Sequence, residues 1–234
     1  MRYMGGKMRI GKQLASVIQR FNPVAYHEPF CGMFSVGKHL VCKRRTACDI
    51  HPDLILLLNA VRDGWQDMPT HVTEEQYNTL SHAESSPLRG FVGFGCSFYG
   101  KFFGGFARDP SMDDFGTIAR KNMLKLAPMI QGVNFKCEPY WEYKGKADVR
   151  YCDPPYAGTT DYSSGEFNHE AFWDWVREQS HESIVVVSEY IAPSDFKAIW
   201  KKPVTTTMKD KTGRGCSRVE KLFQFGFADV VGVD

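Results

Sequence analysis

The four residues Asp153-Pro154-Pro155-Tyr156 combine groups that could bind and activate an aromatic amine. Two consecutive prolines fix φ and remove two backbone donors, so the turn is stiff. The Asp153 carboxylate and the Pro154 carbonyl then offer two acceptors at a fixed separation, next to the Tyr156 ring. An exocyclic amine conjugated to an aromatic ring is a poor nucleophile. Acceptors for both of its hydrogens would localise its lone pair while Tyr156 stacks on the ring. The alternative is a structural turn in which Asp153 caps a helix and Tyr156 belongs to the core.

Three earlier segments also carry residue types suited to ligand binding. They are Arg2-Tyr3-Met4-Gly5-Gly6-Lys7, Glu28-Pro29-Phe30-Cys31-Gly32, and Asp49 at the end of an expected strand. Each has an ordinary explanation when taken alone: a flexible N-terminus, a turn, and a helix cap before Pro52. In an open α/β sheet, however, turns that follow parallel strands meet at one edge, which is where ligands bind. We therefore expect the last two segments and the Asp-Pro-Pro-Tyr turn to converge on one rim.

In their types and in their order along the chain, the four motifs resemble those of the Dam-like family of DNA adenine methyltransferases. The resemblance covers about residues 1–60 and 134–225. It implies an S-adenosylmethionine-dependent enzyme that methylates the N6 amino group of adenine in DNA. Aspartate at position 153 favours adenine, whereas asparagine there would have favoured glutamine and serine would have favoured cytosine N4. An adenine in RNA remains an alternative acceptor.

The resemblance also implies roles for individual residues. Catalysis would fall to the tetrad, Asp153, Pro154, Pro155 and Tyr156. The cofactor would be bound by Tyr3, Lys7, Phe30, Gly32, Asp49, Glu138 and Asp153. Lys7 would meet the carboxylate end of the cofactor, and Asp49 would accept its ribose hydroxyls, as acidic residues do in dinucleotide-binding folds. Glu138 would lie near the cofactor adenine. Its sequence context alone, however, predicts a solvated surface carboxylate.

One residue departs from the family pattern. The family's first loop usually reads Phe-x-Gly-x-Gly, and here Phe34 stands at the second glycine position. A side chain there is expected to narrow the space near the methionine end of the cofactor, or to rearrange the turn. Ser35 and Val36 still match, so we expect adaptation rather than loss. Phe34 is also the only sequence feature that favours a rival hypothesis, a non-catalytic DNA-binding protein derived from a methyltransferase.

Strands alternate with helices along much of the chain, which predicts an α/β fold with a mostly parallel sheet. Helices are expected over residues 7–21, 52–61, 117–130 and 170–179, and strands over 24–30, 45–48, 147–152, 184–188 and 222–225. The pattern breaks after about residue 64. The expected fold is thus a Rossmann-like methyltransferase sheet, residues 1–63 and 134–234, with an inserted target-recognition region, residues 64–133.

A target adenine is stacked and paired inside duplex DNA, so the enzyme would have to flip it out, at a cost of roughly a few kcal/mol. Residues 90–108 are rich in glycine and aromatic side chains, with Lys101 and Arg108 among them. We expect Lys101 to contact phosphates and Arg108 to read guanine edges. The basic stretch 209–218, through Lys209 and Arg214, is a second candidate for phosphate contacts. The alternatives are a packed loop covering the sheet edge and a solvated hairpin.

Composition excludes several classes. The 234 residues, 43% hydrophobic and 24% charged, are typical of a globular protein, and a net charge of +2 says little about partners. Seven scattered cysteines without a CxxC pair predict neither a disulfide scaffold nor a zinc site.

No bilayer-length apolar segment and no signal-peptide core are present, so we expect a cytoplasmic protein without membrane or metal. No GxGxxG follows the first strand, which disfavours a nicotinamide oxidoreductase. The recognition sequence, the oligomeric state and a restriction-modification, phage or housekeeping setting stay open.

Overall fold

The computed structural model describes residues 6–108, 114–156, 167–209 and 215–226. The chain divides into two compact units, Met1–Lys144 and Gly145–Asp234. Each unit contains parallel strands joined by helices, and each is described in turn below.

The first unit is built on three parallel strands in the order β3-β2-β1. They are β1 (Ala25–Glu28), β2 (Arg44–Asp49) and β3 (Val133–Cys137). Asp49 pairs with Cys137 in the register of β2 and β3, so the turns that follow these two strands leave from the same edge. The sequence analysis did not predict β3, although its alternation of buried Val133 and Phe135 with more exposed neighbours is a strand pattern.

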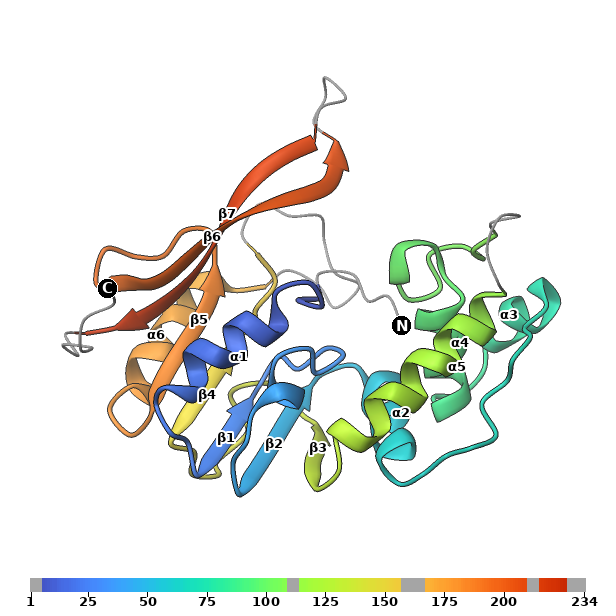
Figure 1. Cartoon of the computed structure of the whole chain (residues 1–234), viewed down its shortest axis with the longest axis horizontal. Coiled ribbons are helices and arrows are strands. Elements are labelled where there is room, and N and C mark those ends of the chain that lie inside the picture. The colour runs from blue at the N-terminus through green and yellow to red at the C-terminus, as the bar shows by residue number, and fades with distance from the viewer. Residues whose placement is uncertain (1–5, 109–113, 157–166, 210–214, 227–234) are drawn as a thin grey trace. The chain divides into compact units, whose positions relative to one another are not determined.

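Helices cover these strands and extend beyond β3 (Figure 1). They are α1 (Gly11–Gln19), α2 (Pro52–Arg62), α3 (Glu74–Ser81), α4 (Pro87–Gly95) and α5 (Phe115–Leu126), with short 3-10 turns η1 (Gly37–His39), η2 (Phe98–Gly100) and η3 (Ala127–Met129). Proline suits the first position of α2, because the N–H that it lacks has no helical partner there. The apolar residues of α2 are buried on nearly all sides, as expected for a helix that packs on β2 and β3 and carries α4 and α5.

Helix α4 was not predicted, because three of its nine residues are glycine, a poor helix former. The structure shows why glycine is required. A Cβ on Gly90 would lie 2.3 Å from the carbonyl oxygen of Asp53 in α2, and a Cβ on Gly93 would lie 2.4 Å from the Phe102 ring. Close packing against α2 and the following loop therefore outweighs the low helix propensity of glycine.

The second unit contains a β-α-β element followed by a hairpin. Strand β4 (Val149–Cys152), helix α6 (His169–Gln179) and strand β5 (Ile184–Glu189) form the β-α-β element, in which β4 and β5 are parallel. Strands β6 (Phe196–Lys209) and β7 (Gly215–Phe225) form a long antiparallel hairpin, and β7 pairs with β5 (Figure 1). The strand order in this unit is β4-β5-β7-β6.

The mixed α/β architecture with mostly parallel strands confirms the predicted Rossmann-like fold class. The hairpin is longer than expected: β6 was not predicted, and β7 begins at residue 215 rather than 222. The division into a catalytic domain, 1–63 and 134–234, and an inserted recognition region, 64–133, stays a prediction. Among the described residues, no helix has the length and apolar character needed to cross a bilayer.

Candidate active site

The carboxylate of Asp49 ties together two turns at the edge of the first unit's strands. Its Oδ2 accepts a hydrogen bond from the Gly32 backbone N–H at 3.0 Å, and its Oδ1 accepts one from the His51 N–H at 3.0 Å. Gly32 has φ +45°, a left-handed conformation that favours glycine. Burial raises the pKa of Asp49, and these backbone donors oppose the rise. The contact with His51, the residue before α2, closes the turn that leads into that helix.

Glu138 follows β3 at the same edge and is not the solvated carboxylate that its sequence context alone suggested. Its side chain is only 21% exposed. Its Oε1 accepts a hydrogen bond from the Cys48 thiol at 3.3 Å, and the Lys136 ammonium lies 3.9 Å away. Burial, together with the hydrogen bond to Glu138, raises the pKa of Cys48 beyond the range in which a thiol ionises. Cys48 therefore remains a neutral donor to the Glu138 carboxylate.

Apolar groups lie next to these two acids. Phe30 stacks on the buried Tyr140 ring with a centroid separation of 5.1 Å and an interplanar angle of 30°. Ile50, directly after Asp49, is 52% exposed. Ile50 and Tyr140 were not predicted from the sequence as site residues. They could have been found because each lies one or two residues after a predicted acidic residue. Together these residues give the edge apolar surface beside two carboxylates.

Phe34 adapts to its unusual position by turning its ring into the core. Its backbone takes φ +51°, the region that the replaced glycine would favour, and its side chain is fully buried. The ring packs edge-on against Phe135 at 5.4 Å and fills the space where a Cβ on Gly37 would sit, 2.4 Å away. A fully buried ring lines no open space, so the expected narrowing beside the cofactor does not follow from Phe34. The strained backbone costs about 1–2 kcal/mol, which this packing offsets.

Lys7 lies four residues before the start of α1. Its carbonyl accepts hydrogen bonds from the N–H groups of Ile10 and Gly11, at 3.1 and 2.6 Å. A Cβ on Gly11 would lie 2.2 Å from the carbonyl oxygen of Ser35, so the first turn of α1 packs directly on the loop that follows β1. This contact brings Lys7 close to that loop. Tyr3 lies outside the described residues.

In the second unit, the tetrad follows β4 directly. Pro154 is buried, whereas Asp153 and Tyr156 are half-buried. The Tyr156 hydroxyl contacts Ser188 Oγ at 3.1 Å and donates a hydrogen bond to the carboxylate of Glu220. Burial, with Asp153 and Glu220 nearby, raises the pKa of Tyr156 well above its usual value, so the phenol keeps its proton. The cap of α6 is Asn168, whose side chain accepts from the Ala171 N–H, so Asp153 does not cap this helix.

Lys101 and Arg108 lie in a loop that is packed on its inner side and open on its outer side. Ser97 and Phe106 form a β-bridge at the base of the loop, and the Tyr77 hydroxyl contacts Ser97 Oγ at 2.7 Å. Both cations are exposed, and Arg108 forms an ion pair with Glu74. The loop is therefore packed on one side and presents both cations to solvent, and their contact with DNA stays a prediction.

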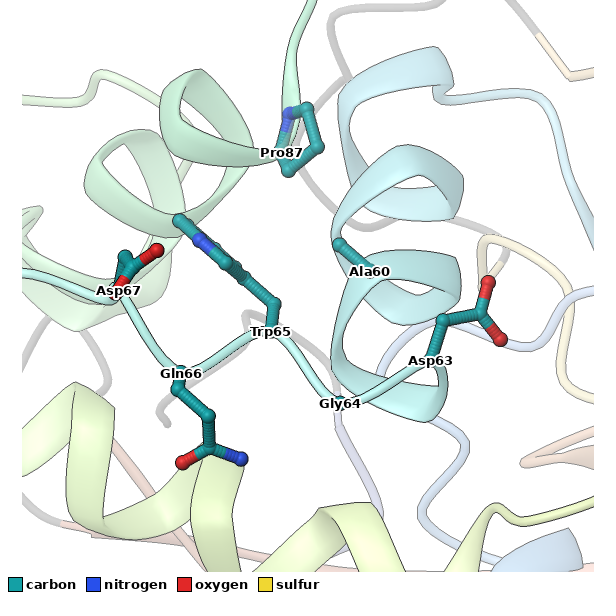
Figure 2. A pocket seen from close by; sticks show the side chains of 7 residues that line it. All are labelled: Ala60, Asp63, Gly64, Trp65, Gln66, Asp67 and Pro87. Carbon is teal, nitrogen blue, oxygen red and sulfur yellow. The ribbon is translucent and has the colours of Figure 1, made fainter.

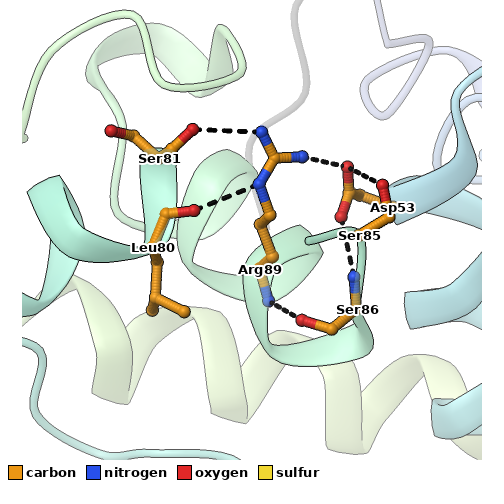
Figure 3. Close-up of polar contacts among 6 residues, drawn as sticks. All are labelled: Asp53, Leu80, Ser81, Ser85, Ser86 and Arg89. Carbon is orange, nitrogen blue, oxygen red and sulfur yellow. Dashed lines mark hydrogen bonds and ion pairs between the residues drawn. The ribbon is translucent and has the colours of Figure 1, made fainter. Parts of the chain in front are cut away.

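Arg89 links three helices through its guanidinium (Figure 3). Its guanidinium donates to the buried Asp53 carboxylate at 2.5 Å and to the carbonyl oxygens of Leu80 and Ser81, each at 3.1 Å. The same group lies over the Phe102 and Phe103 rings, 5.0 and 5.4 Å from their centroids. One side chain therefore connects α2, α3, α4 and the loop.

The second predicted phosphate-contact segment is only partly described. Lys209 ends β6 and pairs with Gly215 across the hairpin. The side chain of Lys209 and all of Arg214 lie outside the described residues.

A groove of about 460 Å³ lies at the end of α2, lined by Trp65 and Pro87 together with the chain from Asp63 to Asp67 (Figure 2). None of the predicted site residues lines it, and Asp49 and Glu138 lie at the strand ends instead. The groove is therefore separate from the candidate cofactor site. In the part of the chain that the structure describes, no group of three His, Cys, Asp or Glu side chains has the spacing of a metal site.

The strands, helices and turns described above define a Rossmann-like α/β fold. Residues 3–86 match the family described as D12 class N6 adenine-specific DNA methyltransferase, in agreement with the family predicted from the sequence. The match contains three of the four motifs, and the tetrad at 153–156 lies beyond it.

Two solved structures match the chain at low sequence identity and low TM-score. A Thermoplasma acidophilum protein is 14% identical, with a TM-score of 0.42, over 94% of this chain and 97% of that one. A candidate methyltransferase complexed with SAH is 14% identical, with a TM-score of 0.33, over 97% of this chain and 55% of that one. No curated protein sequence matches the chain significantly.

Proposed function

We propose that the protein transfers the methyl group of S-adenosylmethionine to the N6 amino group of adenine in DNA. The observation that carries the proposal is the tetrad at the carboxyl end of β4, whose Tyr156 ring is held through its hydroxyl while remaining half-buried. The Asp153 carboxylate and the Pro154 carbonyl would accept the two amine hydrogens. They would thus direct the nitrogen lone pair towards the methyl donor.

The acidic edge of the first unit fits the methyl donor. The Asp49 carboxylate oxygens accept backbone hydrogen bonds from Gly32 and His51, and a carboxylate has about four acceptor sites, which suits ribose hydroxyls. Glu138 would accept from the adenine amino group, with the exposed Ile50 side chain against the adenine face. Lys7 would meet the carboxylate end. The bound cofactor would supply an electrophilic methyl group on sulfur.

The chemical step balances without another reactant. The adenine N6 attacks the methyl carbon, an N–C bond forms as the C–S bond breaks, and S-adenosylhomocysteine leaves. The nitrogen then loses one proton to solvent. Asp153, as the side-chain acceptor of the rigid turn, would stabilise the positive charge that develops on that nitrogen.

DNA would be contacted by the outer face of the loop around Lys101 and Arg108. This loop presents the two cations beside the exposed rings of Phe98 and Tyr99. The target adenine would be flipped out of the duplex into the site. Residues 209–218 would contribute further phosphate contacts.

The decisive experiment is expression of the chain in a host that lacks DNA methylation, followed by modification-aware sequencing of the host DNA. The expected result is N6-methyladenine at one recurrent short sequence, and none in cells that express Asp153→Ala. Unmodified DNA from cells that contain folded protein would refute the proposal. A second candidate, a DNA-binding protein that has lost catalysis, is separated by calorimetry: the proposed enzyme binds S-adenosylhomocysteine, and the second candidate does not. Methylation found only in RNA would indicate the other acceptor.

A further inference from the structure

A second buried carboxylate meets the catalytic tetrad, and it belongs to none of the four sequence motifs. Glu220 lies on β7 and is only 3% exposed. Its Oε1 accepts hydrogen bonds from the Tyr156 hydroxyl and from Ser188 Oγ, the latter at 2.7 Å. Ser188 lies on β5 and is fully buried. The hydroxyl end of Tyr156 is therefore held by side chains from two further strands.

The ring of Tyr156 is held as well. Tyr190 packs edge-to-face against it, with centroids 4.7 Å apart and an interplanar angle of 90°. The Arg218 guanidinium lies 5.0 Å from the centroid of the Tyr190 ring. Hydrogen bonds at one end and a perpendicular ring contact leave Tyr156 little freedom to rotate about its side-chain torsions.

We propose that Glu220, with Ser188, is a positioning residue for the methyl transfer: it anchors the hydroxyl of Tyr156 and so fixes the plane in which the Tyr156 ring stacks on the target adenine. This inference rests on the proposed function. A misplacement of about 1 Å in a reacting group can cost about 100-fold in rate, so a restrained stacking platform has a direct effect on turnover.

The chemistry of the contact supports this assignment. Removing a carboxylate from water is costly unless hydrogen bonds compensate it, and here the hydroxyls of Tyr156 and Ser188 both donate to Glu220. Tyr156 retains its proton and so remains a donor. The alternative is that Glu220 only stabilises the pairing of β5 with β7. In that case, replacing Glu220 would lower the stability of the protein. The effects on turnover of replacing Glu220 and of removing the Tyr156 hydroxyl would then be independent.

The test compares four variants of the full chain: Glu220→Gln, Tyr156→Phe, the double variant, and Lys221→Gln as a matched control. Lys221 is the next residue on β7, and its ammonium lies near the Phe223 ring, 5.7 Å from the centroid. Steady-state kinetics are measured on duplex DNA that contains the recognition sequence, with unfolding in urea measured in parallel.

Glu220→Gln and Tyr156→Phe should each lower kcat about 10- to 100-fold, with KM for DNA and cofactor changed less than about threefold. The double variant should be no slower than the slower single variant, since both remove the same contact. The Lys221→Gln control should turn over like the parent. As a readout independent of turnover, binding is followed with 2-aminopurine at the target position. The fluorescence increase on flipping should persist in Glu220→Gln.

Turnover of Glu220→Gln within twofold of the parent would overturn the inference, as would effects that multiply in the double variant. If Glu220→Gln does not fold, Tyr156→Phe and Ser188→Ala decide, because each removes one of the anchoring hydrogen bonds. Unchanged kcat in both would overturn the inference, and lowered kcat with unchanged KM in both would support it. If the folded parent methylates no DNA, the proposed function itself fails, which is a distinct outcome.

Discussion

Replacing Arg89 by methionine should destabilise the first unit by about 3–5 kcal/mol, the usual cost of breaking a buried ion pair by removing one partner. The Asp53 side chain is 1% exposed and that of Arg89 is 17% exposed. After the change, Asp53 would keep the hydrogen bonds from the Ser86 N–H, at 3.0 Å, and from the Ser85 hydroxyl, at 3.3 Å. Methionine retains much of the apolar stem, so the loss reports on the guanidinium rather than on packing.

The size of this effect makes it measurable. Globular proteins are stable by about 5–15 kcal/mol, so the variant would lose a large share of its stability. A loss of 3 kcal/mol raises the unfolding equilibrium constant by roughly 100-fold. The assay is urea unfolding followed by circular dichroism and tryptophan fluorescence, with the free energy extrapolated to water.

Two controls isolate the buried pair. Arg108→Met removes an arginine whose ion pair with Glu74 is exposed, and it should cost less than about 1 kcal/mol. The double variant Asp53→Asn/Arg89→Met should lose less unfolding free energy than the two single variants lose together, by about 1 kcal/mol or more. A change of less than 1 kcal/mol in Arg89→Met, or strict additivity in the double variant, would refute the reasoning.

The other predictions concern the proposed site. Asp153→Ala should abolish detectable methyl transfer and leave the unfolding curve within about 1 kcal/mol of the parent; near-normal turnover would remove Asp153 from catalysis. Asp49→Ala should weaken S-adenosylhomocysteine binding by about 1.5–3 kcal/mol, roughly 10- to 150-fold in calorimetry, and an unchanged Kd would leave Asp49 as a turn-forming residue only. Since burial raises the pKa of Asp49, the folded state keeps this proton to a higher pH than the unfolded chain. The unfolding free energy of the parent should therefore fall, relative to that of Asp49→Asn, as pH rises from 3.8 through the raised pKa of the folded state. A constant difference between the two proteins at all pH values would contradict this. Lys101→Ala should weaken binding to all duplexes and lower the slope of log K against log salt by about 0.9, whereas Arg108→Ala should relax the recognition sequence at one position. Glu74→Gln releases Arg108 from its ion pair, so its affinity for duplex DNA should equal or exceed that of the parent. If Lys101→Ala and Arg108→Ala both bind DNA like the parent at every salt concentration, the loop has only a structural role.

Local patterns were sufficient for the elements whose own residues contain the signal. The apolar run of β5 and the amphipathic face of α6 were predicted within one residue at each end. Strand β6 carries lysines and a proline within its 14 residues, and only its pairing with β7 makes it a strand. Helix α4 forms because glycines allow it to pack on α2, which no helix propensity anticipates.

For the site, the sequence by itself predicted the candidate chemistry: a stiff Pro-Pro turn that carries Asp153 and Tyr156, and Asp49 at the end of an expected strand. Residue types and their order along the chain contain that information, because each motif is local. Only the tertiary structure decided which distant groups support them. Glu220 is 64 residues from Tyr156, and Cys48 is 90 residues from Glu138. Such contacts depend on strand register and on which face of a sheet each side chain occupies, and these are set when the strands pair.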